Sequence, residues 1–117
     1  MAKMYQLSTC KTCQRIRTEI GDRPDLEVVN IKETAITPPE LDRMAELAGS
    51  YEALFSRRAM KYRSLGLADR ELTEQDYRRL ILEEYTFLKR PVTVVGDRIF
   101  IGSAKKSVAG TREALDA

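Results

Sequence analysis

The chain has 117 residues, of which 43% are hydrophobic and 32% are charged, and its net charge at pH 7 is +2. This is the balance of an ordinary globular domain rather than that of a strongly basic nucleic-acid binder, so we expect no direct nucleic-acid partner. No apolar run approaches the roughly 18 residues of a membrane span, and the first residues lack the apolar centre of a secretory signal. We therefore expect a single domain over residues 1–117, monomeric and cytoplasmic, with no membrane partner.

The chain contains no histidine. No imidazole is available as a general base or metal ligand, which excludes Cys–His catalysis and most zinc chemistry. A zinc site built from soft ligands needs four of them, and Cys10 and Cys13 supply two, so zinc would require a site shared between chains. We expect no metal, and any activation of a cysteine must come from a helix dipole and from cations.

Cys10 and Cys13 form a C-x-x-C motif between a predicted strand over residues 4–7 and a predicted helix over residues 14–20, with Thr9 as a candidate N-cap. The helix N-terminus offers free N–H groups and a positive dipole end, and both favour a thiolate, most strongly at Cys10. Cys13 lies one turn on, where it can resolve a mixed disulfide. The motif predicts a thiol redox site. In the alternative, Cys10 acts alone and Cys13 packs as a small apolar residue.

A turn over residues 21–25 follows, and the β-branched run over residues 26–31 predicts a second strand. Two strands joined through a helix run parallel with a right-handed crossover. The first part of the chain therefore predicts a βαβ unit.

The middle of the chain, about residues 37–88, is predicted to be a helical insertion. Two sequences have the pattern of an N-cap threonine followed by acidic residues in the first turn, one beginning at Thr37 and one at Thr73. Between the two helices that they start, we expect a short helix over residues 50–55 and a basic, less regular segment over residues 56–62.

The last third predicts two strands, over residues 91–95 and 98–101, joined at Gly96-Asp97, and a final helix over residues 103–115. The resulting order is βαβ, helical insertion, ββα. This is the order of an α/β, thioredoxin-like fold with a mixed central sheet.

The chain resembles the arsenate reductase/Spx family (ArsC-like proteins) over nearly its whole length, and in pattern it is most similar to the Spx-like and uncharacterised branches. The order and spacing of several short motifs carry the resemblance: Cys10–Arg17, Pro39–Leu41, Leu54–Arg58, Tyr62–Leu67, Leu88–Val92 and Ile101-Gly102.

The resemblance implies that Cys10 is the nucleophile and that Cys13 or glutathione/glutaredoxin resolves the intermediate. Arg90 and Arg58 would bind an oxyanion, with Arg57 as the alternative to Arg58 because the register is off by one residue, and Pro91 would be a cis proline. From the residues alone, the three arginines also fit solvated surface positions, and Pro91 also fits the start of an ordinary strand.

One departure matters for function. The family's arsenate reductases carry another arginine after the final hairpin, where this chain has Ile99–Gly102, and the C-x-x-C is shared with Spx-type regulators. We expect a thiol-based reductase of a small oxyanion such as arsenate, with no bound cofactor and with glutathione/glutaredoxin or thioredoxin as reductant. The alternatives are an Spx-like redox sensor that binds the RNA polymerase α-subunit and a general thiol–disulfide oxidoreductase.

Overall fold

The computed structural model describes residues 2–116 and divides into two compact units. One unit runs through Thr34 and resumes at Arg90, and the other spans Ala35–Lys89. The second unit corresponds closely to the helical insertion that the sequence predicted over residues 37–88. That all of the chain acts as a single domain stays a prediction.

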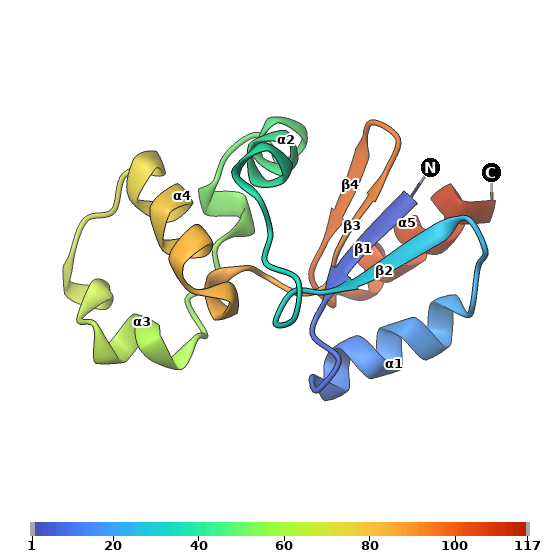
Figure 1. Ribbon diagram of the computed structural model, residues 1–117, viewed down its shortest axis with the longest axis horizontal. Coiled ribbons are helices and arrows are strands. Elements are labelled where there is room, and N and C mark those ends of the chain that lie inside the picture. Colours follow the sequence, from blue (N-terminus) through green and yellow to red (C-terminus); the bar gives the residue numbers. More distant parts are fainter. Residues whose placement is uncertain (1, 117) are drawn as a thin grey trace. The chain divides into compact units, whose positions relative to one another are not determined.

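The first unit is a four-stranded mixed sheet in the order β2-β1-β3-β4, with two helices on one face (Figure 1). The central strand β1 (Ala2–Gln6) is parallel to β2 (Leu26–Asn30) and antiparallel to β3 (Val92–Val95), and β3 is antiparallel to β4 (Arg98–Ile101). Both predicted units, βαβ and ββα, are thereby confirmed.

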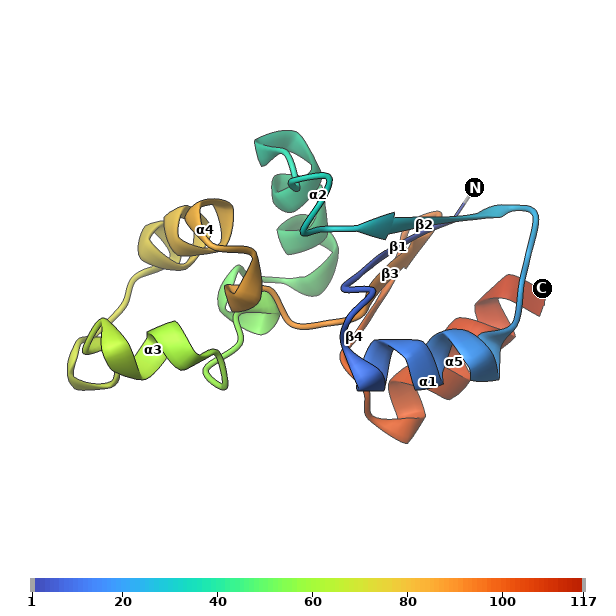
Figure 2. The ribbon, with the colours of Figure 1, turned by 60° about the horizontal axis from the view of Figure 1, so that its bottom comes forward.

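The helices α1 (Lys11–Ile20) and α5 (Lys105–Asp116) lie side by side under the sheet (Figure 2). Alternate residues of β1 point to them, as the period of a strand requires, and α1 contributes a stripe of residues three and four apart. The shared core is formed by Ala2, Met4, Ile16, Ile20, Val108 and Leu115. This core fixes α1, and with it the cysteine motif at its N-terminus, against the sheet.

The second unit is helical throughout. Its two longer helices, α2 (Pro38–Ala48) and α4 (Glu74–Glu83), begin with the predicted threonine caps. In each, the threonine oxygen accepts from the N–H three residues on and the acidic side chain there accepts from the threonine N–H, which satisfies two donors that a helix start leaves open. The remaining elements are short: η1 (Glu52–Leu54), α3 (Met60–Ser64), η2 (Leu67–Asp69) and η3 (Tyr85–Phe87).

Two details of this unit differ from prediction. The short helix expected over residues 50–55 is a single 3-10 turn, η1, and the basic segment expected to be less regular ends in the one-turn helix α3. Both lie beside Phe55, whose fully buried ring packs 4.9 Å from Tyr77 and 5.0 Å from Phe87, measured between ring centroids. Tyr62 of α3 packs edge-on against the same ring, with 6.0 Å between the ring centroids, so the residues around η1 and α3 take part in one aromatic cluster.

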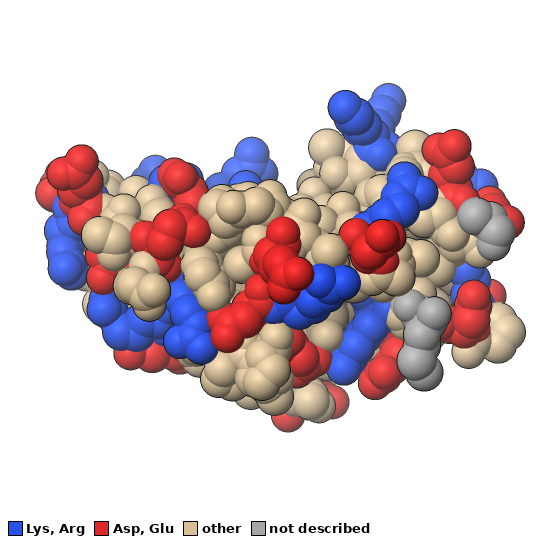
Figure 3. All heavy atoms as spheres, turned by 90° about the horizontal axis from the view of Figure 1, so that it is seen from above, with Lys and Arg blue, Asp and Glu red and all other residues tan. Residues whose placement is uncertain are grey.

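The surface charge is mixed, as the small net charge of +2 leads one to expect. Acidic and basic side chains are interspersed over the face drawn in Figure 3. Within residues 2–116, no helix combines the length and the apolar character that crossing a membrane requires.

Candidate functional site

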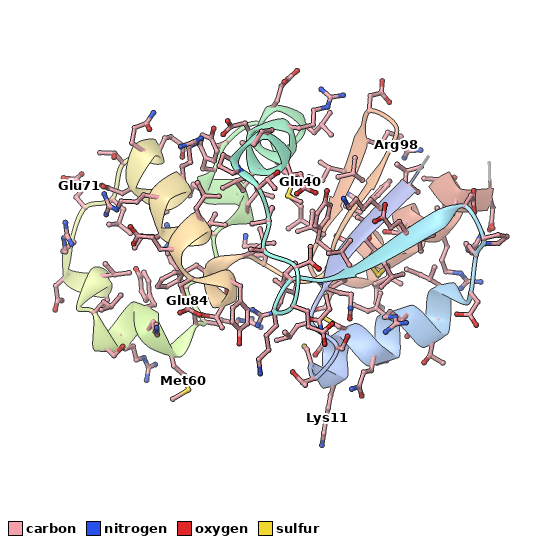
Figure 4. All side chains as sticks on the ribbon, in the orientation of Figure 1. Lys11, Glu40, Met60, Glu71, Glu84 and Arg98 are labelled. Atoms are coloured by element: carbon pink, nitrogen blue, oxygen red, sulfur yellow. The ribbon has the colours of Figure 1, made fainter. Side chains whose placement is uncertain are left out.

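Cys10 is the N-cap residue of α1, with φ −83° and ψ 119°, and its N–H donates to the carbonyl of Leu7 at 3.0 Å. The expectation that Thr9 caps the helix is wrong, because the helix starts at Lys11 (Figure 4) and Thr9 lies exposed in the loop before the cap. The cysteine therefore occupies the position from which a side chain can accept hydrogen bonds from the first free N–H groups of the helix.

The loop that carries Cys10 is held from both ends by glutamine side chains. Gln6, 1% exposed at the end of β1, donates from Nε2 to Ser8 Oγ at 3.2 Å, and Gln14 donates from Nε2 to the Ser8 carbonyl at 2.7 Å. Sequence analysis missed both residues. The available signal was Gln6 itself, a polar residue that alternates along β1 with Ala2 and Met4 and so lies on the same inward face as they do.

The pKa of the Cys10 thiol is lowered from its ordinary value. Partial burial opposes this, but the thiolate is stabilised by the N–H and thiol groups of Cys13, by the N–H of Thr12 and by the positive charge of Arg90. Hydrogen bonds to the charged form and a nearby cation both favour ionisation. Cys10 is thus partly exposed and disposed to be a thiolate, which is the state that acts as a nucleophile.

Cys13 has the opposite properties. It is fully buried, and burial raises the pKa of its thiol to about 11, helped by its hydrogen bond to Cys10 and by the negative charge there. Near neutral pH it is therefore a protonated donor to the Cys10 sulfur. Both cysteines are free thiols in the structure.

Strand pairing brings Arg90 and Pro91 to the edge of the sheet at which the cysteine loop begins. Tyr5 near the end of β1 is paired with Val92 at the start of β3, so the loop after β1 and the segment before β3 lie at the same edge of the sheet. The Arg90–Pro91 peptide bond is cis, the form that the family resemblance implied. Arg90 is close enough for its charge to lower the pKa of both thiols.

The other two predicted oxyanion ligands belong to the second unit. Arg57 donates from Nη2 to Glu52 Oε2 at 2.8 Å and to Tyr77 Oη at 2.9 Å, and its guanidinium lies 5.7 Å from the centre of the Tyr77 ring. These contacts give Arg57 a structural role in its own unit. Arg58 is exposed. Participation of either in an anion site stays a prediction.

Two hollows open beside α1. One, of about 260 Å³, lies at the C-terminal half of the helix near β2 and is lined by residues that include Met4, Ile20 and Val28. The other, of about 460 Å³, is lined by Gln14, Arg17, Thr18, Gly21 and Asp22. Neither contains a cysteine. Among residues 2–116, no three side chains of the types that bind metals most often come together.

Comparison with known proteins places the chain in a family. The chain is 24% identical to the uncharacterised protein YusI of Bacillus subtilis over 84% of this chain and 86% of that protein. It is 26% identical to the global transcriptional regulator Spx 2 of Bacillus anthracis over 87% of this chain and 79% of that protein.

Among solved structures, a possible arsenate reductase from Streptococcus mutans is 27% identical and superposes with a TM-score of 0.72 over 93% of this chain and 98% of that one. This similarity confirms the predicted α/β, thioredoxin-like fold. The sequence profile of the ArsC family matches residues 5–111, which include both cysteines, Arg90 and Pro91. The chain therefore belongs to the ArsC family.

Proposed function

We propose that this protein is a thiol-based reductase of a small tetrahedral oxyanion of the arsenate type, with Cys10 as its nucleophile. One observation carries the proposal: Cys10 combines partial exposure with a lowered pKa, produced by helix N–H groups, the Cys13 thiol and Arg90. The same N–H groups and guanidinium that favour a thiolate also suit an oxyanion bound beside it.

In the proposed reaction, the Cys10 thiolate attacks the arsenic of arsenate. A sulfur–arsenic bond forms, and an arsenate oxygen leaves as water after taking up protons. A second thiolate then attacks the Cys10 sulfur, so that a disulfide forms and the electron pair of the sulfur–arsenic bond stays on arsenic, which departs as arsenite. Two thiols are oxidised and one arsenic centre is reduced, and a further thiol regenerates Cys10 by disulfide exchange.

The structure favours an external thiol, rather than Cys13, for the resolving step. Cys13 is fully buried and its pKa of about 11 keeps it protonated at neutral pH, so it is a poor nucleophile in this conformation. Its S–H is better suited to stabilise the Cys10 thiolate. We therefore propose glutathione, alone or with glutaredoxin, as the source of electrons, and thioredoxin as the alternative.

The test is an arsenate reduction assay with glutathione and glutaredoxin in one arm and thioredoxin in the other. We expect turnover in the first arm, abolished by Cys10→Ser and largely kept by Cys13→Ser. Turnover of 2-hydroxyethyl disulfide but not of arsenate would replace this proposal with general thiol–disulfide exchange. Equal loss in both variants would mean that a Cys10–Cys13 disulfide is obligatory.

A second candidate function is favoured by the similarity to Spx 2, a transcriptional regulator, and by the C-x-x-C motif. In that case an oxidant such as a peroxide would take two electrons from the thiols, and a Cys10–Cys13 disulfide would switch binding to the RNA polymerase α-subunit. A pull-down with the C-terminal domain of that subunit, using reduced and oxidised protein, tests this. Absence of binding in both states would exclude the regulator.

A further inference from the structure

Gln6 is a buried polar residue placed directly before the loop that carries Cys10. It is 1% exposed and alternates along β1 with Ala2 and Met4, which belong to the apolar core. Its Nε2 donates to Ser8 Oγ at 3.2 Å, but its Oε1 is buried without a hydrogen-bond partner among residues 2–116. A buried polar atom without a partner lowers the stability of a fold, so the glutamine needs an explanation that packing does not supply.

The hydrogen bond from Gln6 to Ser8 spans Leu7, and the backbone of Leu7 contacts both cysteines. The Leu7 carbonyl accepts from the N–H of Cys10 at 3.0 Å. The Leu7 N–H is hydrogen-bonded to the sulfur of Cys13 and favours its charged form. Because Gln6 and Ser8 flank Leu7, a bond between their side chains fixes the turn at which the two cysteines are anchored.

Shielding from water distinguishes Gln6 from Gln14, which holds the same loop from the helix. Gln14 donates to the Ser8 carbonyl at 2.7 Å but is exposed, so water can replace its bond. Gln6 is buried, where water does not compete and a hydrogen bond is electrostatically stronger. Of the two glutamines, Gln6 is therefore the one that we expect to set the conformation of the loop.

We propose that Gln6 is a positioning residue, whose buried amide holds the turn at Ser8 so that the Cys10 sulfur stays at the N-cap of α1. There the sulfur accepts from the N–H groups of Thr12 and Cys13. Without the bond from Gln6, the loop gains conformations in which the sulfur leaves these groups and the thiolate loses their stabilisation. The unpaired Oε1 is then a cost in stability at a functional position. The inference rests on the proposed role of Cys10 as the nucleophile.

The experiment compares the reactivity of Cys10 with the stability of the full chain in two single variants. Gln6→Met keeps an unbranched side chain of similar length and removes both polar atoms, and Ser8→Ala removes the acceptor in the loop without changing the sheet. The rate of iodoacetamide alkylation of Cys10 against pH, resolved by peptide mapping, gives the pH midpoint of its reactivity. Urea unfolding gives the stability of each variant.

Both variants should raise the pH midpoint of Cys10 by roughly half to one unit, which corresponds to the loss of one ordinary hydrogen bond at a factor of ten per unit. Gln6→Met should leave the urea midpoint unchanged or raise it, because the buried unpaired oxygen is removed together with the bond. Combining Gln6→Met with Ser8→Ala should raise the pH midpoint no further than either change alone, because both remove the same bond.

Thr111→Val is the matched control. Thr111 is a buried polar residue of the same unit, on α5, and its hydroxyl donates within its own helix to the Ser107 carbonyl. This variant should change the stability without moving the pH midpoint of Cys10. A merely structural role of Gln6 would lower the stability and leave the pH midpoint in place. That result, or additive shifts in the double variant, would overturn the inference. Absence of arsenate turnover in the wild-type protein would overturn the proposed function alone.

Discussion

At the scale of single residues, the main result is that two cysteines three positions apart have opposite properties. Cys13 lies on the apolar stripe of α1 with Ile16 and Ile20, so it is buried and its pKa is raised. Cys10 lies one turn earlier at the N-cap, where N–H groups and Arg90 lower its pKa. The motif therefore supplies one thiolate and one thiol donor rather than two equivalent thiols.

The first prediction concerns the hydrogen bond from Cys13. Cys13→Ala removes the donor and should raise the pKa of Cys10, whereas Cys13→Ser keeps a hydroxyl donor and should change it less. The measurement is the rate of iodoacetamide alkylation of Cys10 against pH. Circular dichroism checks that both variants fold. If the two variants both titrate as the wild type does, the Cys13 thiol does not act on Cys10.

The second prediction concerns the charge of Arg90. Arg90→Gln should raise the pH at which Cys10 becomes reactive and should weaken the protection that sulfate or arsenate gives Cys10 against alkylation, because both depend on a cation beside the sulfur. Arg90→Lys keeps the charge and should restore much of the first effect but less of the second, because lysine lacks the two-pronged geometry. Arg112→Gln, an exposed arginine of α5, is the control. Unchanged alkylation and protection in Arg90→Gln would leave Arg90 with no part in the site.

At the scale of elements, α5 lies close to the sheet at one glycine. A Cβ atom added to Gly110 would lie 2.7 Å from Cε1 of Phe100 on β4. The glycine is needed for this close approach of helix and ring and not for its backbone angles, since it is not among the glycines of positive φ. The packing of α5 against β4 therefore depends on position 110 being a glycine, which has no side chain.

The third prediction is that Gly110→Ala destabilises the protein despite the higher helix propensity of alanine. Alanine gains about 1 kcal/mol in helix propensity, while forcing a methyl group against a ring costs about 1–3 kcal/mol. The measurement is urea unfolding. In a Phe100→Leu background the same change should become neutral or stabilising, which isolates the contact. An unchanged or increased stability of the single variant would contradict the clash.

In the second unit, a polar cluster connects α2 and α4 with Tyr51, the residue before η1. Asp42 accepts from the Tyr51 hydroxyl at 2.6 Å and from Arg78 Nε at 2.8 Å, and these bonds lower the pKa of Asp42. The hydrogen bond from Arg78 lowers the pKa of Asp42 most, the hydrogen bond from Tyr51 lowers it further, and slight desolvation of the carboxylate acts against both.

The fourth prediction follows from the sign of that shift. A carboxyl whose pKa is lowered by folding stabilises the fold above its unfolded pKa of about 3.9, and this contribution is lost as the pH falls through its lower folded value. Asp42→Asn should therefore lower the melting temperature at pH 7, and the difference from the wild type should shrink below about pH 4. A difference that is constant with pH would mean that the charge of Asp42 does not contribute. Glu46→Gln, on the exposed face of α2, is the control.

At the scale of the whole molecule, much of the fold follows from sequence because its signals are local. The βαβ and ββα units came from strand composition and helix periodicity, and the caps at Thr37 and Thr73 came from side-chain chemistry three residues apart. The turn η1 and the helix α3 are too short to show helical periodicity, and α3 contributes Tyr62 to the aromatic cluster around Phe55, which joins residues far apart in the chain.

The candidate site was predictable in its residues but not in its electrostatics. The C-x-x-C motif and the Arg90-Pro91 pair could be read from the chain. That Cys10 rather than Thr9 is the N-cap, and that Cys13 is buried, depend on where α1 begins and how it packs. The supporting role of Gln6 and Gln14 also requires the folded loop, because each donates to the same residue from a different element.

The most direct test of the account is the pH dependence of alkylation of the two cysteines in the wild-type protein, resolved by peptide mapping after a short pulse of iodoacetamide. The account predicts that Cys10 reacts with a midpoint below the value of about 8.5 for a free cysteine, while Cys13 stays unmodified at the same pH. A Cys10 midpoint at or above that of a free cysteine, or equal modification of both residues, would contradict it.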